Sequence, residues 1–211
     1  DGNGGTDTQA IAVTVTNVNE APVITSSAAV SAAENQTAVA TVTSGDVDGG
    51  APSYSIVGGA DAALFSIDPS TGVLTFNTAP NFEAPADVDG DNVYDVTVQV
   101  SDSNGGTDIQ AIAVTVTAVN DNNPVITSDG GGATATLNVA ENATAVTAVT
   151  ASDADLPSQT LTYSITGGAD AAKFAIDSST GVLTFVAAPN FETPADANAD
   201  NVYDVVVQVS D

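Results

Sequence analysis

The residues best suited to chemistry are oxygen donors in the middle of the chain. The stretch Val119–Pro124 reads Val-Asn-Asp-Asn-Asn-Pro, and it joins the alternating apolar run Ala111–Thr117 to the extended segment Val125–Thr127. Carboxylate and carbonyl oxygens bind hard cations, and Ca²⁺ takes about six to eight of them in a flexible geometry. This short segment therefore predicts part of a calcium site at a joint between two strand-rich units.

A second group of acidic residues alternates around a glycine. Residues 87–92 read Asp-Val-Asp-Gly-Asp-Asn, and residues 196–201 repeat the pattern as Asp-Ala-Asn-Ala-Asp-Asn. This spacing resembles a calcium loop, so Asp87, Asp89 and Asp91 are candidate metal ligands. The bidentate Glu that completes an EF-hand loop is absent. The alternative interpretation is that these acids are solvated loop charges.

Composition excludes several classes of function. The chain has one basic residue against 27 acidic ones and a formal net charge of -26, so it cannot neutralise the phosphates of a nucleic acid. It has no apolar run near the length of about 20 residues that crosses a membrane, so no direct membrane insertion is expected. Without Cys or His there is no disulfide, no thiolate or imidazole metal site and no nucleophile–base pair. We therefore expect a protein that is not an enzyme.

An internal repeat sets the architecture. Residues 1–19 recur almost unchanged at 102–120, and much of 54–96 recurs at 163–205. The two offsets make Asp1 equivalent to Asp211. The aromatic residues pair off between the copies, which predicts a shared core rather than a binding patch. The pairs are Tyr54, Phe65, Phe76, Phe82 and Tyr94 with Tyr163, Phe174, Phe185, Phe191 and Tyr203.

Alternating Val, Ile, Ala and Thr residues predict strands, because branched side chains suit a pleated surface. Seven short strands in about 100 residues, separated by Gly and Pro turns, predict a β-sandwich. We expect the last strand of a preceding or exchanged repeat plus a linker at 1–20, a first repeat at 21–120, and a second repeat at 121–211 that lacks its own last strand. The expected strands are 8–16, 23–33, 37–43, 53–57, 65–67, 73–76, 92–101 and 108–117, with a helical turn at 60–64.

Five short motifs occur in one order along the chain. In the first copy they are Glu34-Asn35, Asp46-Val47-Asp48, Asn81-Phe82-Glu83, Asp102 and Ala118–Pro124, and in the second they are Glu141-Asn142, Asp153-Ala154-Asp155, Asn190-Phe191-Glu192 and Asp211. This order resembles that of tandem cadherin repeats, of the bacterial cadherin or RTX-adhesin type. The resemblance implies two tandem seven-stranded Greek-key, immunoglobulin-like β-sandwiches joined by a short calcium-binding linker.

The resemblance also implies ligand sets at the repeat junctions. The central joint would use Glu34, Glu83, Asn120, Asp121, Asn122, Asp153, Asp155 and Asp211. The upstream joint would use Asn19, Glu20, Asp46, Asp48 and Asp102, and a downstream joint would use Glu141 and Glu192. Two residues depart from the family pattern, because Asn81 and Ala118 replace aspartates, and this implies weaker binding or fewer ions.

The implied function is mechanical. The repeats are expected to form a Ca²⁺-rigidified extender of a large adhesin that is extracellular, either secreted or at the cell surface. Its partners would be neighbouring repeats of the same chain or identical subunits. A first alternative is a self-assembling filament in which residues 7–16 complete the second repeat of a neighbour by strand donation. A second alternative is a module that binds carbohydrate or protein ligands.

Overall fold

The structure is a computed structural model that describes residues 2–211; Asp1, the expected equivalent of Asp211, lies outside the described residues. Contacts divide the chain into two units. Unit 1 contains the residues up to Pro80 and Ala86–Val116, and unit 2 contains Asn81–Pro85 and Thr117–Asp211. Among residues 2–211 no helix is long and apolar enough to span a bilayer.

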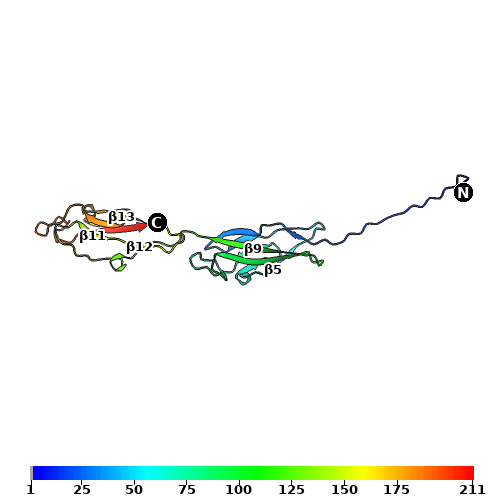
Figure 1. Cartoon of the computed structure of the whole chain (residues 1–211), viewed down its shortest axis with the longest axis horizontal. Coiled ribbons are helices and arrows are strands. Elements are labelled where there is room, and N and C mark those ends of the chain that lie inside the picture. Colours follow the sequence, from blue (N-terminus) through cyan, green and yellow to red (C-terminus); the bar gives the residue numbers. More distant parts are fainter. Residues whose placement is uncertain (1) are drawn as a thin grey trace. The chain divides into compact units, whose positions relative to one another are not determined.

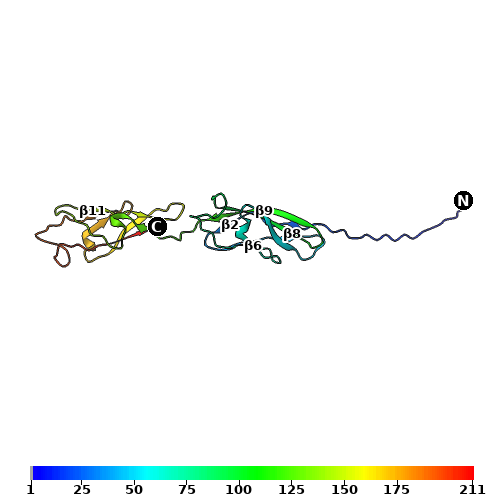
Figure 2. The same ribbon diagram turned by 90° about the horizontal axis from the view of Figure 1, so that it is seen from below.

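Unit 1 consists of short antiparallel strands in two main sheets. One sheet has the order β2-β9-β8-β5 and the other the order β3-β7-β6, while β1 pairs with β4. Figure 1 labels β5 and β9, and Figure 2 shows β2, β8 and β9 from below. The elements are β1 (Val23–Ile24), β2 (Ala29–Ala33), β3 (Ala38–Thr41), β4 (Ser44–Gly45), β5 (Ser53–Gly58), η1 (Ala62–Leu64), β6 (Phe65–Ile67), β7 (Val73–Phe76), β8 (Val93–Ser101) and β9 (Thr107–Thr117).

The core of unit 1 follows from the two-residue period of its longest strands. Along β8, Val96, Val98 and Val100 are at most 1% exposed, whereas the residues between them are half-buried. Alternate side chains of a strand point to opposite faces, so each strand contributes one apolar face to the sandwich interior. The aromatic side chains complete that interior, because Phe76 stacks on Phe65 and meets Tyr94 edge to face at 5.1 Å between ring centroids.

Unit 2 repeats much of this arrangement. It has a three-stranded sheet, β11-β15-β14, and the pairs β10-β12 and β13-β16. The same aromatic cluster recurs with Phe174, Phe185 and Tyr203. The elements are β10 (Val125–Ile126), η2 (Ser128–Gly130), β11 (Ala145–Ala148), β12 (Ala151–Ser152), β13 (Thr162–Gly167), η3 (Ala171–Lys173), β14 (Phe174–Ile176), β15 (Val182–Phe185) and β16 (Val206–Ser210).

The units differ at one sheet edge. In unit 1, β9 lies between β2 and β8, but in unit 2 β16 pairs only with β13. Residues 133–140, which correspond in sequence to the region of β2, form no strand. A strand is stabilised by hydrogen bonds to its neighbours, and among residues 2–211 no segment takes the position beside β16 that β9 has beside β8. As a result Val205, Val207 and Val209 are only half-buried.

The all-β sandwich fold predicted from the sequence is confirmed, and most strands lie within a residue or two of their expected positions. Two predictions need comment. One concerns the helix-free segment before β1: residues 2–22 contain no strand in the described chain, so residues 8–16 do not form a strand by themselves, and their assignment as the last strand of a preceding or exchanged repeat stays a prediction. Phe191 is 65% exposed and therefore does not belong to the shared aromatic core.

Candidate functional site

At one end of unit 1, Asp102 is fixed in the loop that joins β8 to β9. Its Oδ1 atom accepts hydrogen bonds from the backbone N–H groups of Asn104 at 2.8 Å and Gly106 at 2.9 Å. Its Oδ2 atom accepts one from the Asn19 side-chain amide at 2.7 Å. The hydrogen bond from Asn19 lowers the pKa of Asp102, so this nearly buried carboxyl group is held in its ionised form.

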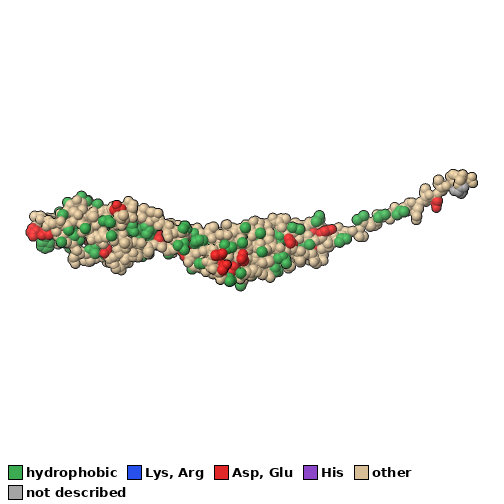
Figure 3. All heavy atoms as spheres, viewed as in Figure 1, with side chains coloured by type: hydrophobic (Ala, Val, Ile, Leu, Met, Phe, Trp, Pro, Cys, Tyr) green, Lys and Arg blue, Asp and Glu red, His purple; other side chains and the backbone are tan. Residues whose placement is uncertain are grey.

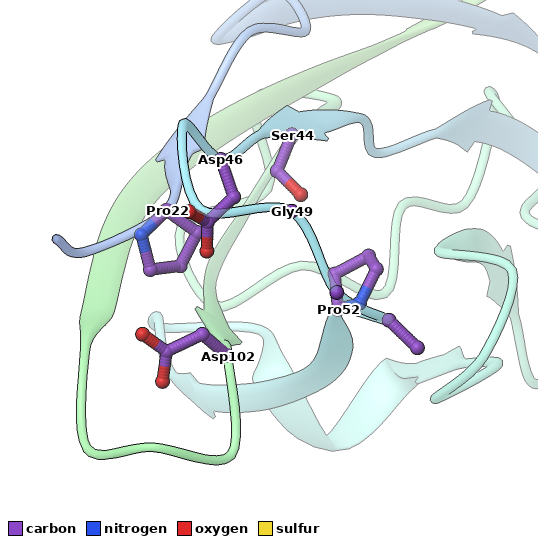
Figure 4. Close-up of a pocket in the computed structure, with 8 residues that line it drawn as sticks. Pro22, Ser44, Asp46, Gly49, Pro52 and Asp102 are labelled. Carbon is purple, nitrogen blue, oxygen red and sulfur yellow. The ribbon is translucent and has the colours of Figure 1, made fainter. Parts of the chain in front are cut away.

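The Asp46-Val47-Asp48 motif lies at the same end of unit 1. The Asp48 carboxylate accepts hydrogen bonds from the Asn17 side chain at 2.7 Å and the Glu20 backbone N–H at 2.6 Å. Asp46 and Asp102 line one hollow beside Pro22 and are carried by two different loops (Figure 4). The upstream candidates Asn19, Glu20, Asp46, Asp48 and Asp102 therefore meet at one end of the sandwich.

Like charges crowd this end of unit 1. The hydrogen bond between Glu20 and Asp48, together with the charge of Asp48, raises the pKa of Glu20. The hydrogen bond from Asn17 acts in the opposite direction and lowers the pKa of Asp48. A bound cation would reduce the repulsion between these carboxylates, because an opposite charge favours the ionised form of each.

The equivalent end of unit 2 brings three aspartates together. Asp153 and Asp155 follow β12, Asp211 follows β16, and each offers a carboxylate oxygen that lies within 4.8 Å of the other two. Asp155 is 2% exposed, and the Oδ2 atom of Asp153 is shielded from solvent without a hydrogen-bond partner among residues 2–211. A shielded carboxylate oxygen without a partner is costly unless a cation or donor meets it. This geometry suits a metal ion.

The linker folds back on these aspartates within unit 2. The side-chain amide of Asn122 donates to Asp155 at 2.6 Å and to Asp121 at 2.8 Å, and the Asn122 backbone N–H donates to Asp155 at 3.1 Å. The hydrogen bond from the Asn122 side chain lowers the pKa of Asp155. Asn120 donates to Gln159 at 3.0 Å, and Gln159 in turn donates to Asp155 at 3.3 Å. The linker and the Asp153–Asp155 loop are thus joined by amide–carboxylate contacts.

The glutamate candidates have different surroundings. Glu34 is 2% exposed at the end of β2. Glu83 belongs to the segment Asn81–Pro85 of unit 2, where its Oε1 atom accepts a hydrogen bond from the Leu156 N–H at 3.1 Å. Glu141 is exposed and accepts a hydrogen bond from the Phe191 N–H at 3.0 Å, and Glu192 is exposed. The two downstream candidates therefore remain open to solvent, unlike Glu34.

The acidic loop of unit 1 forms a group of its own. Asp87, Asp89 and Asp91 each offer a carboxylate oxygen, and these oxygens lie within 4.8 Å of one another. Unit 1 contains no Lys or Arg that could pair with them, because the single basic residue of the chain is Lys173. The face in Figure 3 shows several acidic side chains gathered over unit 1. Unit 1 therefore holds clustered negative charge that none of its own side chains can neutralise.

Sequence reasoning missed two residues that position the acidic groups. Gln159 links Asn120 to Asp155, and Asn17 binds Asp48. In the sequence, Asn17 could have been recognised because the equivalent position of the second copy is Ala118. Gln159 could have been recognised as an amide side chain four residues after Asp155. Both side chains offer a carbonyl oxygen as well as N–H donors, so they can bind carboxylates or cations.

Comparison with known proteins identifies related chains. The family model described as the cadherin domain matches residues 26–119. Mouse protocadherin Fat 2 is 33% identical over 149 residues, or 67% of this chain, and human protocadherin Fat 1 is 33% identical over 166 residues, or 75% of this chain. The chain spans 3% of the length of each of these relatives.

Solved structures share the fold. Human protocadherin-24 EC1-2 matches 92% of this chain and 94% of its own with a TM-score of 0.66 at 22% identity. Protocadherin gamma B2 extracellular cadherin domains 3-6 match 90% of this chain and 47% of their own with a TM-score of 0.60 at 25% identity.

Proposed function

Because this chain belongs to the cadherin domain family, as a pair of tandem cadherin-like repeats, we propose that it is a calcium-stiffened spacer in an extracellular adhesion protein. The repeats would be residues 21–120 and 121–211. The observation that carries this proposal is the group formed by Asp153, Asp155 and Asp211, with the Asp153 Oδ2 atom shielded from solvent and unpaired within residues 2–211.

The proposed central site uses ligands from the linker and from both repeats. Asp153, Asp155 and Asp211 supply carboxylates, and the linker supplies oxygens of Asn120, Asp121 and Asn122. The cadherin resemblance adds Glu34 and Glu83 to the proposed set, and Glu83 lies in the segment Asn81–Pro85 of unit 2. Oxygen-only coordination with several carboxylates is what Ca²⁺ requires. Each ion bound by the folded state alone stabilises it by about 2.7 kcal/mol at 100 times the dissociation constant.

The mechanical effect can be tested by small-angle scattering of the 211-residue chain in CaCl₂ and in EDTA. We expect chelation to broaden the distribution of interatomic distances and to increase protease cleavage at residues 118–124. The Asp153→Asn/Asp155→Asn variant in CaCl₂ should behave like the wild type in EDTA. Identical scattering profiles with calcium and with chelator would refute the stiffening role.

A second candidate function, head-to-tail self-association, is favoured by a separate observation. Ile11, Val13 and Val15 are 76%, 81% and 91% exposed, whereas the same residues of the matching sequence in β9 are buried. Within residues 2–211 no strand pairs with the second edge of β16, and β16 borders a shallow, open hollow of about 530 Å³ that Ile126, Ala133, Val207 and Val209 help to line. We propose that residues 7–16 of a second copy add to β16 as β9 adds to β8.

A further inference from the structure

The loop between β7 and β8 carries a group of carboxylates that shares no residue with the proposed junction sites. In unit 1 this loop contains Asp87, Asp89 and Asp91, whose carboxylate oxygens approach within 4.8 Å of one another. Asp89 and Asp91 are exposed, but Asp87 is only 7% exposed.

Asp87 provides the independent evidence for a ligand. Its Oδ2 atom accepts a hydrogen bond from the Asp91 N–H at 2.8 Å. Its Oδ1 atom is shielded from solvent and has no hydrogen-bond partner among the described residues. A buried carboxylate oxygen needs a donor or a cation, and unit 1 has no basic side chain to supply one. A cation next to the other two carboxylates would satisfy it.

The loop is held in place by residues that do not belong to the acidic group. Asp61, which is 4% exposed, accepts hydrogen bonds from the Val88 N–H and the Asp95 N–H, both at 2.8 Å. Asp91 accepts one from the Val93 N–H at 2.8 Å. These contacts fix the loop to the start of β8, so the three carboxylates stay together without a cation and a site is organised in advance.

Unit 2 contains the same loop with one informative change. Asp196 repeats Asp87, since it is 8% exposed and its Oδ1 atom is also shielded and without a partner in the described chain. Asn198 replaces Asp89, and its side-chain amide donates to the Asp200 carboxylate at 2.9 Å. The amide thus stabilises the Asp200 carboxylate through a hydrogen bond. The loop also carries one negative charge fewer than the loop of unit 1.

We propose that Asp87, Asp89 and Asp91 bind one Ca²⁺ ion within unit 1, and that the matching loop of unit 2, which has one carboxylate fewer, binds Ca²⁺ at least about tenfold more weakly. Ca²⁺ suits the site because the side-chain ligands are all carboxylate oxygens and Asp89 and Asp91 face solvent, which leaves room for coordinated water. Affinity for calcium depends on the number of ligand charges, so the change from Asp89 to Asn198 accounts for the difference between the two loops.

The test is an NMR titration of the ¹⁵N-labelled 211-residue chain with CaCl₂, with MgCl₂ in a parallel titration. We expect the amides of residues 88–93 to shift with a saturable midpoint, and those of residues 197–202 to shift only at Ca²⁺ concentrations at least about tenfold higher. Asp89→Asn, which copies the natural residue of the other loop, should raise that midpoint at least about tenfold. The amides of residues 153–156 should respond as in the wild type, which separates this site from the proposed junction site.

Asn198→Asp is the reciprocal variant. It should lower the midpoint of the calcium response of residues 197–202 at least about tenfold, and equilibrium dialysis at a concentration between the two wild-type midpoints should then count one more bound ion. The proposal is overturned if residues 88–93 respond to CaCl₂ no more than residues 197–202 do, or if Asp89→Asn leaves their midpoint unchanged. An equal midpoint with MgCl₂ would overturn the assignment to Ca²⁺.

Discussion

Replacing Val13 with Ala tests the strand-exchange function without disturbing the free chain. Val13 is 81% exposed, so its truncation removes no contact from the unassociated molecule. If residues 7–16 pair with β16 of a second copy, Val13 takes the position that Val114 has in β9, where the side chain is 0% exposed. The entire energetic effect of Val13→Ala should therefore fall on association.

The size of the effect follows from the burial of Val114. In the associated state, Val13→Ala removes two buried methyl groups, which contribute about 0.8 kcal/mol each to the free energy of association. A residual cavity raises the loss toward about 3 kcal/mol. Because each 1.4 kcal/mol is about a tenfold change, the association constant should fall about 15- to 150-fold. Thr14→Ala is the matched control, since its counterpart Thr115 is exposed in β9.

Sedimentation velocity over a concentration series measures both variants against the wild type. The wild type and Thr14→Ala should form a ladder of head-to-tail oligomers at similar concentrations, and Val13→Ala should need correspondingly higher ones. A wild-type chain that stays monomeric at millimolar concentration would refute the exchange. Equal association of Val13→Ala and the wild type would show that residues 7–16 do not occupy the position of β9.

Three further predictions concern the carboxylates and the turns. Asp155→Asn should reduce the calcium-dependent rise in Tm, whereas Asp204→Asn, which changes an exposed acid on the neighbouring strand segment, should leave it unchanged in calorimetry. Hydrogen bonds from Asn19 and Asn122 lower the pKa values of Asp102 and Asp155, respectively. The stabilisation from these ionised carboxylates is therefore complete above about pH 4, and it is lost as the pH falls through the lowered pKa values. Calcium-free urea titrations from about pH 6 to pH 2 should therefore show falling stability, and Asn122→Ala should flatten the part of this fall that comes from Asp155. Gly72→Ala should destabilise unit 1 by at least about 1 kcal/mol, because φ is +70° and a Cβ atom would collide with the Val42 carbonyl oxygen. Gly90→Ala should cost less, because Gly90 has a similar φ of +74° but open space around it. Urea unfolding of both variants measures the difference.

The sequence predicted the strands well where burial imposes a strict period. β8 and β9 were recognised because Val and Ile alternate with polar residues, and the structure buries those apolar side chains. The split of 23–33 into β1 and β2 was not predicted. The intervening residues Thr25–Ala28 form hydrogen bonds outside a continuous ladder, including Thr25 N–H to the Thr43 carbonyl at 2.8 Å. Hydrogen bonds of this kind produce no alternation of apolar and polar residues in the sequence.

The sequence identified the acidic residues that could bind a metal ion, but not the side chains that contact them. The repeated motifs identified Asp153, Asp155 and Asp211, and the structure brings these three together within unit 2. The amide contacts that hold them could not be read from the sequence, since Asn122 and Gln159 reach Asp155 from opposite sides along the chain. Nor does a sequence show that one oxygen of Asp87 is shielded while its neighbours are exposed.

The repeats allow one last step, because they place almost the same sequence in two environments. Residues 7–16 and 108–117 differ at a single position, Thr8 against Ile109, yet the first segment forms no strand and the second is most of β9. Intrinsic propensity is the same in both, so the neighbouring strands decide the outcome. Ile112, Val114 and Val116 are at most 2% exposed because β8 and β2 flank them. The same reasoning applies to β16, whose half-buried valines need the strand that β8 already has. If residues 7–16 of a second copy add to β16, as proposed, the apolar side chains of both segments become buried.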